Sequence, residues 1–489
     1  MSFVKNQLLV GLDIGTSSVK ACVYDRHGAK YFSTRKPLLN TIYSGSMVEQ
    51  DPYEVLSAVV EVLKTLANVF KDEELYIGLS STSPSLVVVD GECNPLYNII
   101  AWMDRRAVEE AKLLESQIGR FEIVRKTGLY CDSIFTAPKI LWVKRHLPSL
   151  FNKAKFFIQL KDYVFYHLTM QPYTDFSHIS ETLLYTLKGD FYSEILNLID
   201  ITPENIFKPA SSSSIFKINP SPLMRELQEL RGRVFIALGG VDSVVANLGA
   251  GAVSSNIASD TTGTSTCINI ILKEPSEKFI GVFEIYRHVI DNYFVLEASL
   301  PTSGFFLDKI LDLVGADYTL LDKLDEKPSP LLVHPFLEGT RSPDWNPRML
   351  GSIYGLSTSV SKEDLVKGVL EGVAFWIRNI IDIVKNGGLQ IDEVRSGGGG
   401  GRGVWNKIKA NVTGVVYKEP FELEASSLGA AILAGLGAGF FKDVVEAVSS
   451  MVKINHTFFP NPNYKPIYDD KYRNWLSIWS FYRKLLTMK

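Results

Sequence analysis

The sequence predicts an α/β protein of two domains. Strand and helix signals alternate through the first third of the chain. A length of 489 residues exceeds what one hydrophobic core normally serves. A strand–turn–strand segment with an aspartate before a Gly/Ser/Thr turn occurs twice, at residues 8–25 and 256–272. The repeat suggests two related halves; the alternative is coincidence, because such hairpins are common.

The first third predicts strands and helices in alternation. The apolar residues of 52–70 recur at helical spacing, and Asp51 with Pro52 marks the start of that helix. Alternating and continuous apolar runs predict the strands. The expected elements, strands unless marked, are 7–15, 19–25, 29–35, 52–70 (helix), 74–81, 86–90, 107–118 (helix) and 137–146 (helix).

The rest of the chain is less regular. Residues 190–235 are rich in Pro and Ser around 203–222, which predicts a loose surface stretch, and 234–242 then reads as a buried strand ending in Gly-Gly. A long helix is expected at 362–385, and a helix at 404–414 follows five consecutive glycines. The uncharged run 425–441 is rich in Gly and Ala and short for a membrane span, so we expect a buried, closely packed helix.

Composition excludes several classes of function. The chain has 51 basic and 54 acidic residues, a net charge of −3, which gives no reason to expect nucleic acid or an anionic membrane as a partner. Its four cysteines form no CxxC pair, so zinc-site spacing is absent. Scattered cysteines and the lack of a basic-then-apolar leader favour a cytoplasmic protein.

The first turn, in LLVGLDIGTSSVKACVYD, has the composition of a phosphate site. Thr16, Ser17 and Ser18 offer hydroxyls and backbone N–H groups in one small concavity, and Lys20 adds a positive charge nearby. Asp13 can hold a hydrated Mg²⁺ against the phosphates. The segment does not match the P-loop pattern. The alternative is a tight turn with a self-capping aspartate.

The second turn, DTTGTST, repeats this composition, so two facing turns could hold a polyphosphate from both sides. The glycine run that leads into a helix N-terminus could pack against a flat base or accept phosphate. A flexible surface loop explains the glycine run equally well.

Two further segments carry candidate chemistry. Asp242 follows Gly-Gly at the end of a strand and opens a helix, so it can accept the proton of an attacking hydroxyl; it could also be a helix N-cap. In AWMDRRA, Trp102, Asp104 and Arg105 combine an aromatic wall with charged hydrogen-bonding groups, which suits a polyol. The alternative is a core tryptophan beside a surface ion pair.

Eight segments together resemble the FGGY carbohydrate kinases. They appear in family order and at family spacing from about residue 8 to 440, and Gly368 departs from the usual Ala or Ser. The segments are GLDIGTSSVK, AWMDRR, TAPKILWVKRH, GGVDSVVANLGAG, DTTGTST, GSIYGLSTSVSKEDLVKGVLEG, SGGGGGRGVWNKIKANVTG and EASSLGAAILAG.

The resemblance implies two actin-like, ribonuclease H-like domains with ATP, Mg²⁺ and sugar in an interdomain cleft. Residues 1–243 would form the sugar-binding domain with the phosphate turn, and 244–489 the nucleotide-binding domain, with possible homodimers. Asp242 would be the catalytic base and a sugar ligand, and Asp13 would serve the metal. Ser83, Trp102 and Asp104 would face the sugar. ATP would be bound by Thr16, Ser17, Ser18, Lys20, Gly263, Thr264, Gly399, Gly400 and Asn406.

The resemblance leaves two candidate substrates. HPFLEGTRSPDWNPRMLGSIYGLS resembles the xylulokinase and gluconokinase branches. Where glycerol kinases carry Arg-Glu and xylulokinases Met-His, this chain has Ser83-Pro84, so glycerol is disfavoured and this end of the site is expected to be roomier. A ketopentose such as D-xylulose is the first expectation. Gluconate, with Arg105 or Arg106 facing its carboxylate, is the alternative.

Two other classes share the expected fold. Actin and the heat-shock ATPases use ATP to drive binding, and a degenerate kinase could act as a sugar sensor. The retained Asp242 and AWMDRR favour a sugar kinase over both.

Overall fold

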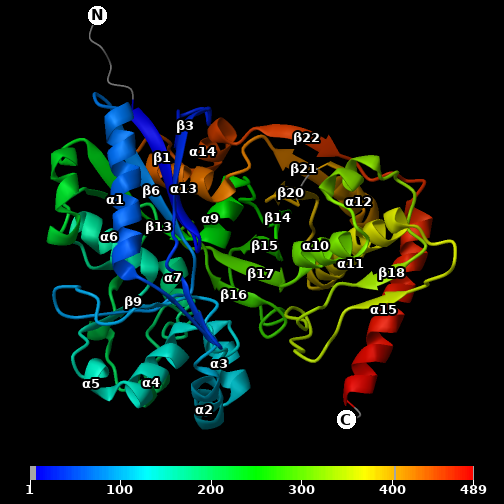
Figure 1. The fold of residues 1–489 in the computed structure, drawn as a ribbon, viewed down its shortest axis with the longest axis horizontal. Coiled ribbons are helices and arrows are strands. Elements are labelled where there is room, and N and C mark those ends of the chain that lie inside the picture. The colour runs from blue at the N-terminus through cyan, green and yellow to red at the C-terminus, as the bar shows by residue number, and fades with distance from the viewer. Residues whose placement is uncertain (1–6, 401–402, 488–489) are drawn as a thin grey trace, which may run out of the picture.

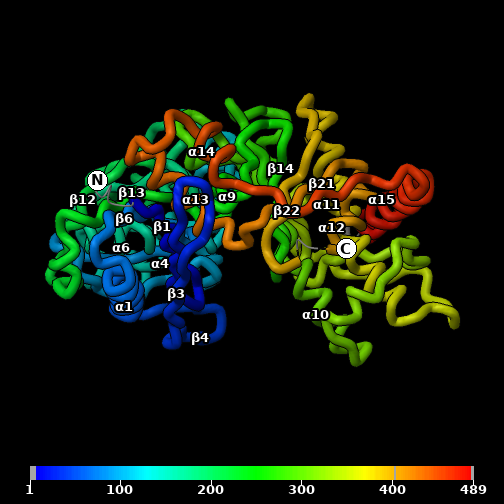
Figure 2. Tube along the Cα trace, turned by 90° about the horizontal axis from the view of Figure 1, so that it is seen from above, coloured from blue at the N-terminus to red at the C-terminus, as the bar shows by residue number. Residues whose placement is uncertain are grey.

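The computed structural model describes residues 7–400 and 403–487. Two large sheets lie in two bodies, seen on the left and right of Figure 2. In spatial order the six-stranded sheet contains β12 (Ile215–Lys217), β13 (Val234–Val241), β6 (Glu74–Ser81), β1 (Gln7–Ile14), β2 (Ser18–Tyr24) and β3 (Lys30–Pro37). The seven-stranded sheet contains β16 (Glu284–Arg287), β17 (Phe294–Leu300), β15 (Thr266–Leu272), β14 (Ile257–Thr262), β20 (Glu393–Gly397), β21 (Val416–Pro420) and β22 (Ile454–Phe458).

The two sheets share one topology. In the first, β1, β2 and β3 are antiparallel neighbours, while β6 and then β13 run parallel to β1. In the second, β14, β15 and β17 are antiparallel neighbours, while β20 and β21 run parallel to β14. The shared order supports the prediction of two related halves, and the two-domain α/β fold is confirmed.

Helices cover both sheets (Figure 1). Those before residue 240 are α1 (Pro52–Val69), α2 (Val108–Ile118), α3 (Arg120–Thr127), α4 (Thr136–His146), α5 (Pro148–Phe151), α6 (Leu160–Thr169), α7 (Phe176–Ser180) and α8 (Ser193–Ile199). Those after it are α9 (Asp242–Gly249), α10 (Ser303–Leu313), α11 (Lys362–Asn386), α12 (Gly403–Thr413), α13 (Ala425–Gly437), α14 (Val444–Met451) and α15 (Lys465–Thr487).

Short strands and 3₁₀ turns complete the chain. The small strands are β4 (Ile42–Ser44), β5 (Met47–Gln50), β7 (Val87–Val89), β8 (Ile99–Ile100), β9 (Phe156–Ile158), β10 (Tyr173–Asp175), β11 (Lys208–Ala210), β18 (Leu332–His334) and β19 (Ser352–Tyr354). The 3₁₀ turns are Pro203–Asn205, Pro222–Leu230 and Tyr318–Lys323.

The start of α1 is where the sequence predicts it. The Asp51 carboxylate accepts a hydrogen bond from the backbone N–H of Tyr53 at 2.8 Å, and Pro52 occupies the first turn, where its missing N–H costs nothing. The predicted loose surface stretch is wrong in part. Phe207 is buried at 1% exposure, and β12 pairs with β13 as the edge of the first sheet.

Helix α13 returns to the first body although it lies late in the chain (Figures 1 and 2). A Cβ added to Gly11 of β1 would stand 1.7 Å from the Ser427 carbonyl oxygen, and one on Gly78 of β6 would stand 1.8 Å from that of Ala430. Helix and sheet backbones therefore touch, which only glycine permits. The prediction of a buried, closely packed helix is confirmed. Among the described residues, no helix is long and apolar enough to cross a membrane.

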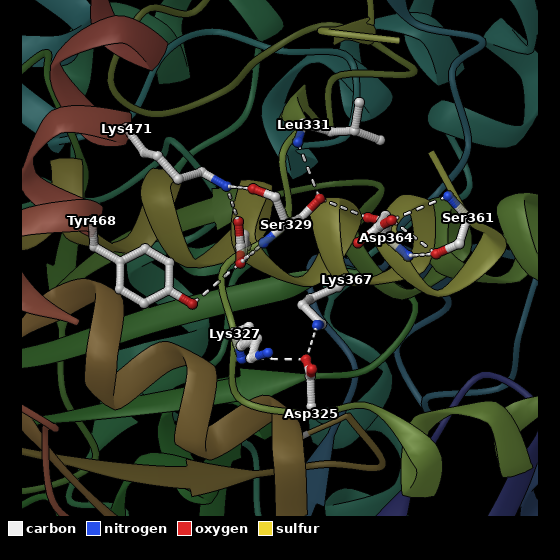
Figure 3. A network of polar contacts seen from close by, with 10 residues as sticks. Asp325, Lys327, Ser329, Leu331, Ser361, Asp364, Lys367, Tyr468 and Lys471 are labelled. Atoms are coloured by element: carbon white, nitrogen blue, oxygen red, sulfur yellow. Dashed lines mark hydrogen bonds and ion pairs between the residues drawn. The ribbon is translucent and has the colours of Figure 1, made fainter. Parts of the chain in front are cut away.

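The last helix, α15, is anchored to the second body by a polar network (Figure 3). Lys471 forms an ion pair with the buried Glu371 of α11 and also donates to the Ser329 carbonyl oxygen. The hydroxyl of Tyr468 donates to Glu371 at 3.1 Å. Pairing compensates a carboxylate whose burial raises its pKa.

Candidate functional site

Three parallel strands of the first sheet end at one edge and carry polar residues there. Asp13 of β1 lies opposite Ser80 of β6, and Ser80 lies opposite Gly240 of β13. Asp242 follows β13 directly. The register therefore brings Asp13 and Asp242 to the same edge, close enough for the Asp13 charge to raise the pKa of Asp242.

Asp13 is a lightly bonded carboxylate. Its Oδ1 accepts a hydrogen bond from the Ser80 hydroxyl at 2.8 Å, and Lys20 Nζ lies 4.0 Å from Oδ2. The Asp13 side chain is 18% exposed, and Lys20 is drawn into an ion pair with Glu424. Burial raises the pKa of Asp13, and the Ser80 hydrogen bond and Lys20 offset only part of that rise. A partly exposed carboxylate with one weakly engaged oxygen fits a single contact to a hydrated Mg²⁺.

Asp242 is positioned by the end of β13 and the start of α9. Its Oδ1 accepts a hydrogen bond from the Ser243 N–H at 2.8 Å within the first turn of α9, but Val241 occupies the N-cap position, so the N-cap alternative is wrong. The preceding Val241 N–H donates to the Ser177 hydroxyl of α7 at 3.1 Å, which fixes the chain there. Burial and then the charge of Asp13 raise the pKa of Asp242 to about 7. A carboxyl with such a pKa can accept a proton near neutral pH.

The first turn faces Trp102. The Trp102 indole N–H donates to the Thr16 hydroxyl at 3.0 Å, and the Gln50 side chain donates to the Thr16 carbonyl oxygen at 2.8 Å. Ser17 is exposed, whereas Ser18 is buried at 9% exposure. The Ser18 carbonyl oxygen accepts a hydrogen bond from the Gly15 N–H, which closes the turn. The structure thus brings the predicted phosphate turn beside the predicted sugar wall.

Asp104 is fully engaged by the protein. It is 0% exposed, and its carboxylate accepts hydrogen bonds from the Val48 N–H at 2.6 Å and from the Arg106 guanidinium at 2.8 to 3.0 Å. Arg106 also pairs with Glu49 at 2.7 Å, and Arg105 pairs with Asp132 at 2.7 Å. Asp104 and Arg106 therefore hold this loop together. A sugar contact from Asp104 stays a prediction and would require some of these bonds to open.

The second turn and the glycine run lie against each other. β14 and β20 are paired so that Thr261 lies opposite Gly397, and the Gly400 N–H donates to the Thr262 carbonyl oxygen at 3.0 Å. A Cβ on Gly398, which has φ +75°, would stand 2.4 Å from that same oxygen. Side chains are thus excluded from this junction. The exposed residues Gly263, Thr264 and Gly399 lie around it.

Asn406 supports this junction from behind. It is buried on α12, and its amide donates to the Ser396 hydroxyl at 2.9 Å and to Glu419 at 3.4 Å. Among the described residues, no group of three or more His, Cys, Asp or Glu side chains is arranged to hold a metal. A metal at Asp13 would therefore take its other ligands from water and phosphate.

A cluster of carboxylates near Asp242 was missed by sequence reasoning. Glu181, Glu284 and Glu297 are 9%, 6% and 9% exposed. Glu297 accepts hydrogen bonds from the Ser243 and Tyr286 hydroxyls at 3.0 and 2.8 Å. The available signal was Glu297 itself, a charged residue within the otherwise strand-like FVLEASL.

Two family models match most of the chain. Residues 8–249 match the FGGY family of carbohydrate kinases, N-terminal domain, and residues 258–438 match the C-terminal domain of the same family.

Individual relatives extend over almost the whole length. A gluconokinase of Bacillus subtilis is 28% identical, covering 92% of this chain and 91% of the relative. A xylulose kinase of Staphylococcus epidermidis is 27% identical, covering 98% of each chain. The crystal structure of a xyloylose kinase from Brucella ovis superposes with a TM-score of 0.90 at 25% identity, covering 98% of this chain and all of the other.

Proposed function

Because this chain belongs to the FGGY family of carbohydrate kinases, we propose that it transfers the γ-phosphoryl group of ATP to a terminal hydroxyl of a small sugar. The favoured acceptor is a ketopentose such as D-xylulose. The first body would bind the sugar and the second the nucleotide.

The main support for this proposal is the position and the raised pKa of Asp242. A carboxyl group lies at the carboxyl end of a parallel strand, beside a phosphate-type turn, and its pKa is raised to about 7 by burial and by Asp13. A carboxyl group that only stabilises the first turn of a helix needs no such environment. A general base must be ionised yet retain affinity for a proton near the working pH, which this environment supplies.

The proposed reaction uses the chain's own groups as follows. Asp242 accepts the proton of the sugar hydroxyl as that oxygen forms a bond to the γ-phosphorus. The bond between the γ-phosphorus and the β–γ bridging oxygen breaks, and ADP leaves. Backbone N–H groups and hydroxyls of the turns at Thr16–Ser18 and Gly263–Thr264, with Lys20, would stabilise the phosphoryl oxygens. Gly399, Gly400 and Asn406 would border adenosine.

The metal has a defined place in this proposal. Asp13 would hold Mg²⁺ against the phosphates, where the ion supplies charge neutralisation for phosphoryl transfer. On the sugar side, Trp102 offers an aromatic surface, and Ser83 lies near Asp242 through their common neighbour Glu181.

A second candidate acceptor is gluconate, which the 28% identical gluconokinase favours. The arginines considered for its carboxylate are both engaged, Arg106 by Asp104 and Glu49 and Arg105 by Asp132. Carboxylates of this chain also surround Asp242. These features support an uncharged acceptor over gluconate.

The test is ADP release with MgATP against D-xylulose, D-ribulose, L-ribulose, gluconate, glycerol and erythritol. We expect strong turnover with D-xylulose. Turnover with gluconate alone would replace the proposed acceptor. Slow hydrolysis of ATP that no sugar accelerates would contradict sugar phosphorylation and favour a binding role.

A further inference from the structure

The face of β16 and β17 turned toward the first body is unusually acidic. Glu284 and Glu297 lie directly opposite each other in the antiparallel register. Opposed like charges destabilise a sheet, so this arrangement has a cost that the fold alone does not explain. Burial, together with the Glu297 charge, raises the pKa of Glu284 to about 7 despite the opposing effect of Arg341.

Alternation along the two strands fixes the direction of this face. Tyr286 and Val295 share it and pack in the same core as Val244 of α9. Ile285 and Leu296 point the other way, into the core of the second body. The two glutamates are therefore turned toward α9 and Asp242.

Glu181 approaches the same place from the first body. It follows α7, which packs against both β13 and β16. Its side chain is 9% exposed, and within the described part of the chain its Oε2 has no hydrogen-bond partner. The Ser83 hydroxyl lies beside it and lowers the pKa of Glu181 by hydrogen bonding. Burial raises the pKa of Glu181 well above its usual range, and Glu297, Glu284 and Asp242 raise it further.

Burial therefore favours the protonated form of the Glu181 carboxyl, which has one O–H donor and remaining acceptor capacity. Among the described residues, Oε2 of Glu181 has no partner within hydrogen-bond distance, and the Ser83 hydroxyl lies beside the carboxyl group. Two more atoms of the facing sheet, Asn269 Oδ1 and Ser299 Oγ, are likewise unpartnered among the described residues. Asn269 lies opposite Glu297 and Ser299 opposite Cys267 in the register of β15 and β17. Unpartnered buried polar atoms call for an explanation, and several at one place fit a ligand with several hydroxyl groups.

The positive charge nearby is already balanced. Arg341 Nη1 lies 4.0 Å from Glu284 Oε1, and the Arg341 charge also lowers the pKa of Asp132. Glu284, Glu297 and Asp242 lie near one another, with Arg341 as the nearby cation, while Glu181 is expected to be protonated. A ligand carboxylate would meet like charges here, whereas a hydroxyl would meet hydrogen-bonding groups.

We propose that Glu181, with Ser83, hydrogen-bonds a hydroxyl of the acceptor sugar, and that the facing pair Glu284 and Glu297 makes the site reject sugar acids. This inference rests on the proposed function and identifies its acceptor class as uncharged sugars. Glu181 is assigned to recognition, not to proton transfer, which belongs to Asp242.

The test measures sugar binding directly, by calorimetry in the presence of a non-hydrolysable ATP analogue. D-xylulose and D-xylonate form the probe pair, since they share five carbons and differ in charge. We expect wild type to bind D-xylulose at least tenfold more tightly than D-xylonate. Glu181→Ala should weaken D-xylulose about tenfold, while Glu181→Gln, which keeps a donor and an acceptor, should stay within about threefold of wild type. Glu284→Gln should narrow the preference over D-xylonate.

Glu73→Ala is the matched control. Glu73 precedes β6 at the end opposite Ser80, and its Oε2 is also unpartnered among the described residues. It should leave sugar binding unchanged. A structural role for Glu181 would move the ATP KM and the sugar KM together, whereas recognition moves the sugar KM alone.

The outcomes separate the two proposals. Intact D-xylulose binding without any sugar-dependent ADP release would defeat the kinase proposal and leave this one standing. Wild-type affinity for D-xylulose in Glu181→Ala, or no D-xylulose binding by the wild type, would overturn the role of Glu181. A preference of the wild type for D-xylonate would overturn the rejection of sugar acids by Glu284 and Glu297.

Discussion

The turns β1–β2 and β14–β15 occupy equivalent places in their sheets, but their aspartates differ in exposure and in ion pairing. Asp13 lies opposite Ser80 of the parallel neighbour, and Asp260 lies opposite Ser396 of its own. Asp13 is 18% exposed, and its nearest cation stands 4.0 Å away. Asp260 is 0% exposed and pairs with the equally buried Lys409 at 2.8 Å.

The difference teaches that one sequence pattern has two physical roles. Lys409 and the Thr262 hydroxyl, which donates at 2.7 Å, compensate the charge of Asp260 inside the protein. The charge of Asp13 is left partly uncompensated and partly accessible. This difference fits the roles proposed for Asp13 and Asp242, whereas the charge of Asp260 is paired within the second body.

The largest effect on turnover should come from a substitution of Asp242, at the edge of the first sheet where β1, β6 and β13 end. Asp242→Asn keeps the shape of the side chain but cannot accept a proton, so kcat should fall by about 10²- to 10⁴-fold. The KM for ATP should stay nearly unchanged, because the proposed contact of Asp242 is with the acceptor hydroxyl and not with ATP. Steady-state ADP release measures both constants. More than a tenth of the wild-type kcat would show that Asp242 is not the base.

The next effect separates the two turn aspartates by stability. Asp260→Asn leaves the Lys409 ammonium buried without its partner and should lower the free energy of unfolding by about 3–5 kcal/mol. Asp13→Asn should leave it unchanged or raise it, since burial disfavours the Asp13 charge. Asp13→Asn should still reduce turnover, because it removes the proposed metal ligand. Urea denaturation compares the two, and Asp260→Asn with Lys409→Met should recover part of the loss.

A pH titration sharpens the contrast between working and paired carboxylates. Asp242 must be ionised to act, so kcat/KM should rise through about pH 7 and level off above it. The sign for stability is opposite. The pKa of Asp242 is about 7 in the folded protein and about 3.9 in the unfolded chain. Its contribution to the free energy of unfolding is therefore fully present below about pH 3.9 and is lost as the pH rises through about 7.

Asp242→Asn should flatten that part of the stability profile, and its melting temperature should exceed that of wild type at pH 8. An activity profile that is flat between pH 6 and 8, with saturating MgATP, would contradict the assignment.

The smallest effects compare glycines at the two turns. A Cβ on Gly304 of α10 would stand 2.0 Å from the Gly263 carbonyl oxygen, so Gly304→Ala must displace the second turn. One on Gly15 would stand 3.3 Å from the Ser18 carbonyl oxygen, which a small shift relieves. We expect the KM for ATP to rise about tenfold in Gly304→Ala and less than threefold in Gly15→Ala. Equal effects would mean that the second turn does not contact nucleotide.

The sequence predicted elements that depend on local pattern. The helix that starts at Asp51 and Pro52, the strand that ends before Asp242 and the buried run at 425–437 all lie where expected. It also paired the two turns as equivalents, which the sheet topology supports.

The remaining features arise from tertiary contacts. The ion pair between Asp260 and Lys409 joins residues far apart in sequence, so nothing local distinguishes Asp260 from Asp13. The meeting of Glu181 with Glu284 and Glu297 requires α7 to pack against β16, a contact between the two bodies. From AWMDRR alone, Asp104 was predicted to contact the sugar. The sequence does not reveal its hydrogen bond from the Val48 N–H, because Val48 lies on a separate strand.

The return of α13 to the first sheet has a consequence for biosynthesis. The glycines at positions 11 and 78 are shaped to receive a helix that ends at residue 437. A nascent chain that has emerged only to the end of β13 therefore lacks the helix that covers the β1 and β6 backbones. Its early-made strands must wait for late-made residues, so the first body is expected to be completed near the end of translation, and a fragment ending before residue 425 is expected to aggregate rather than fold alone.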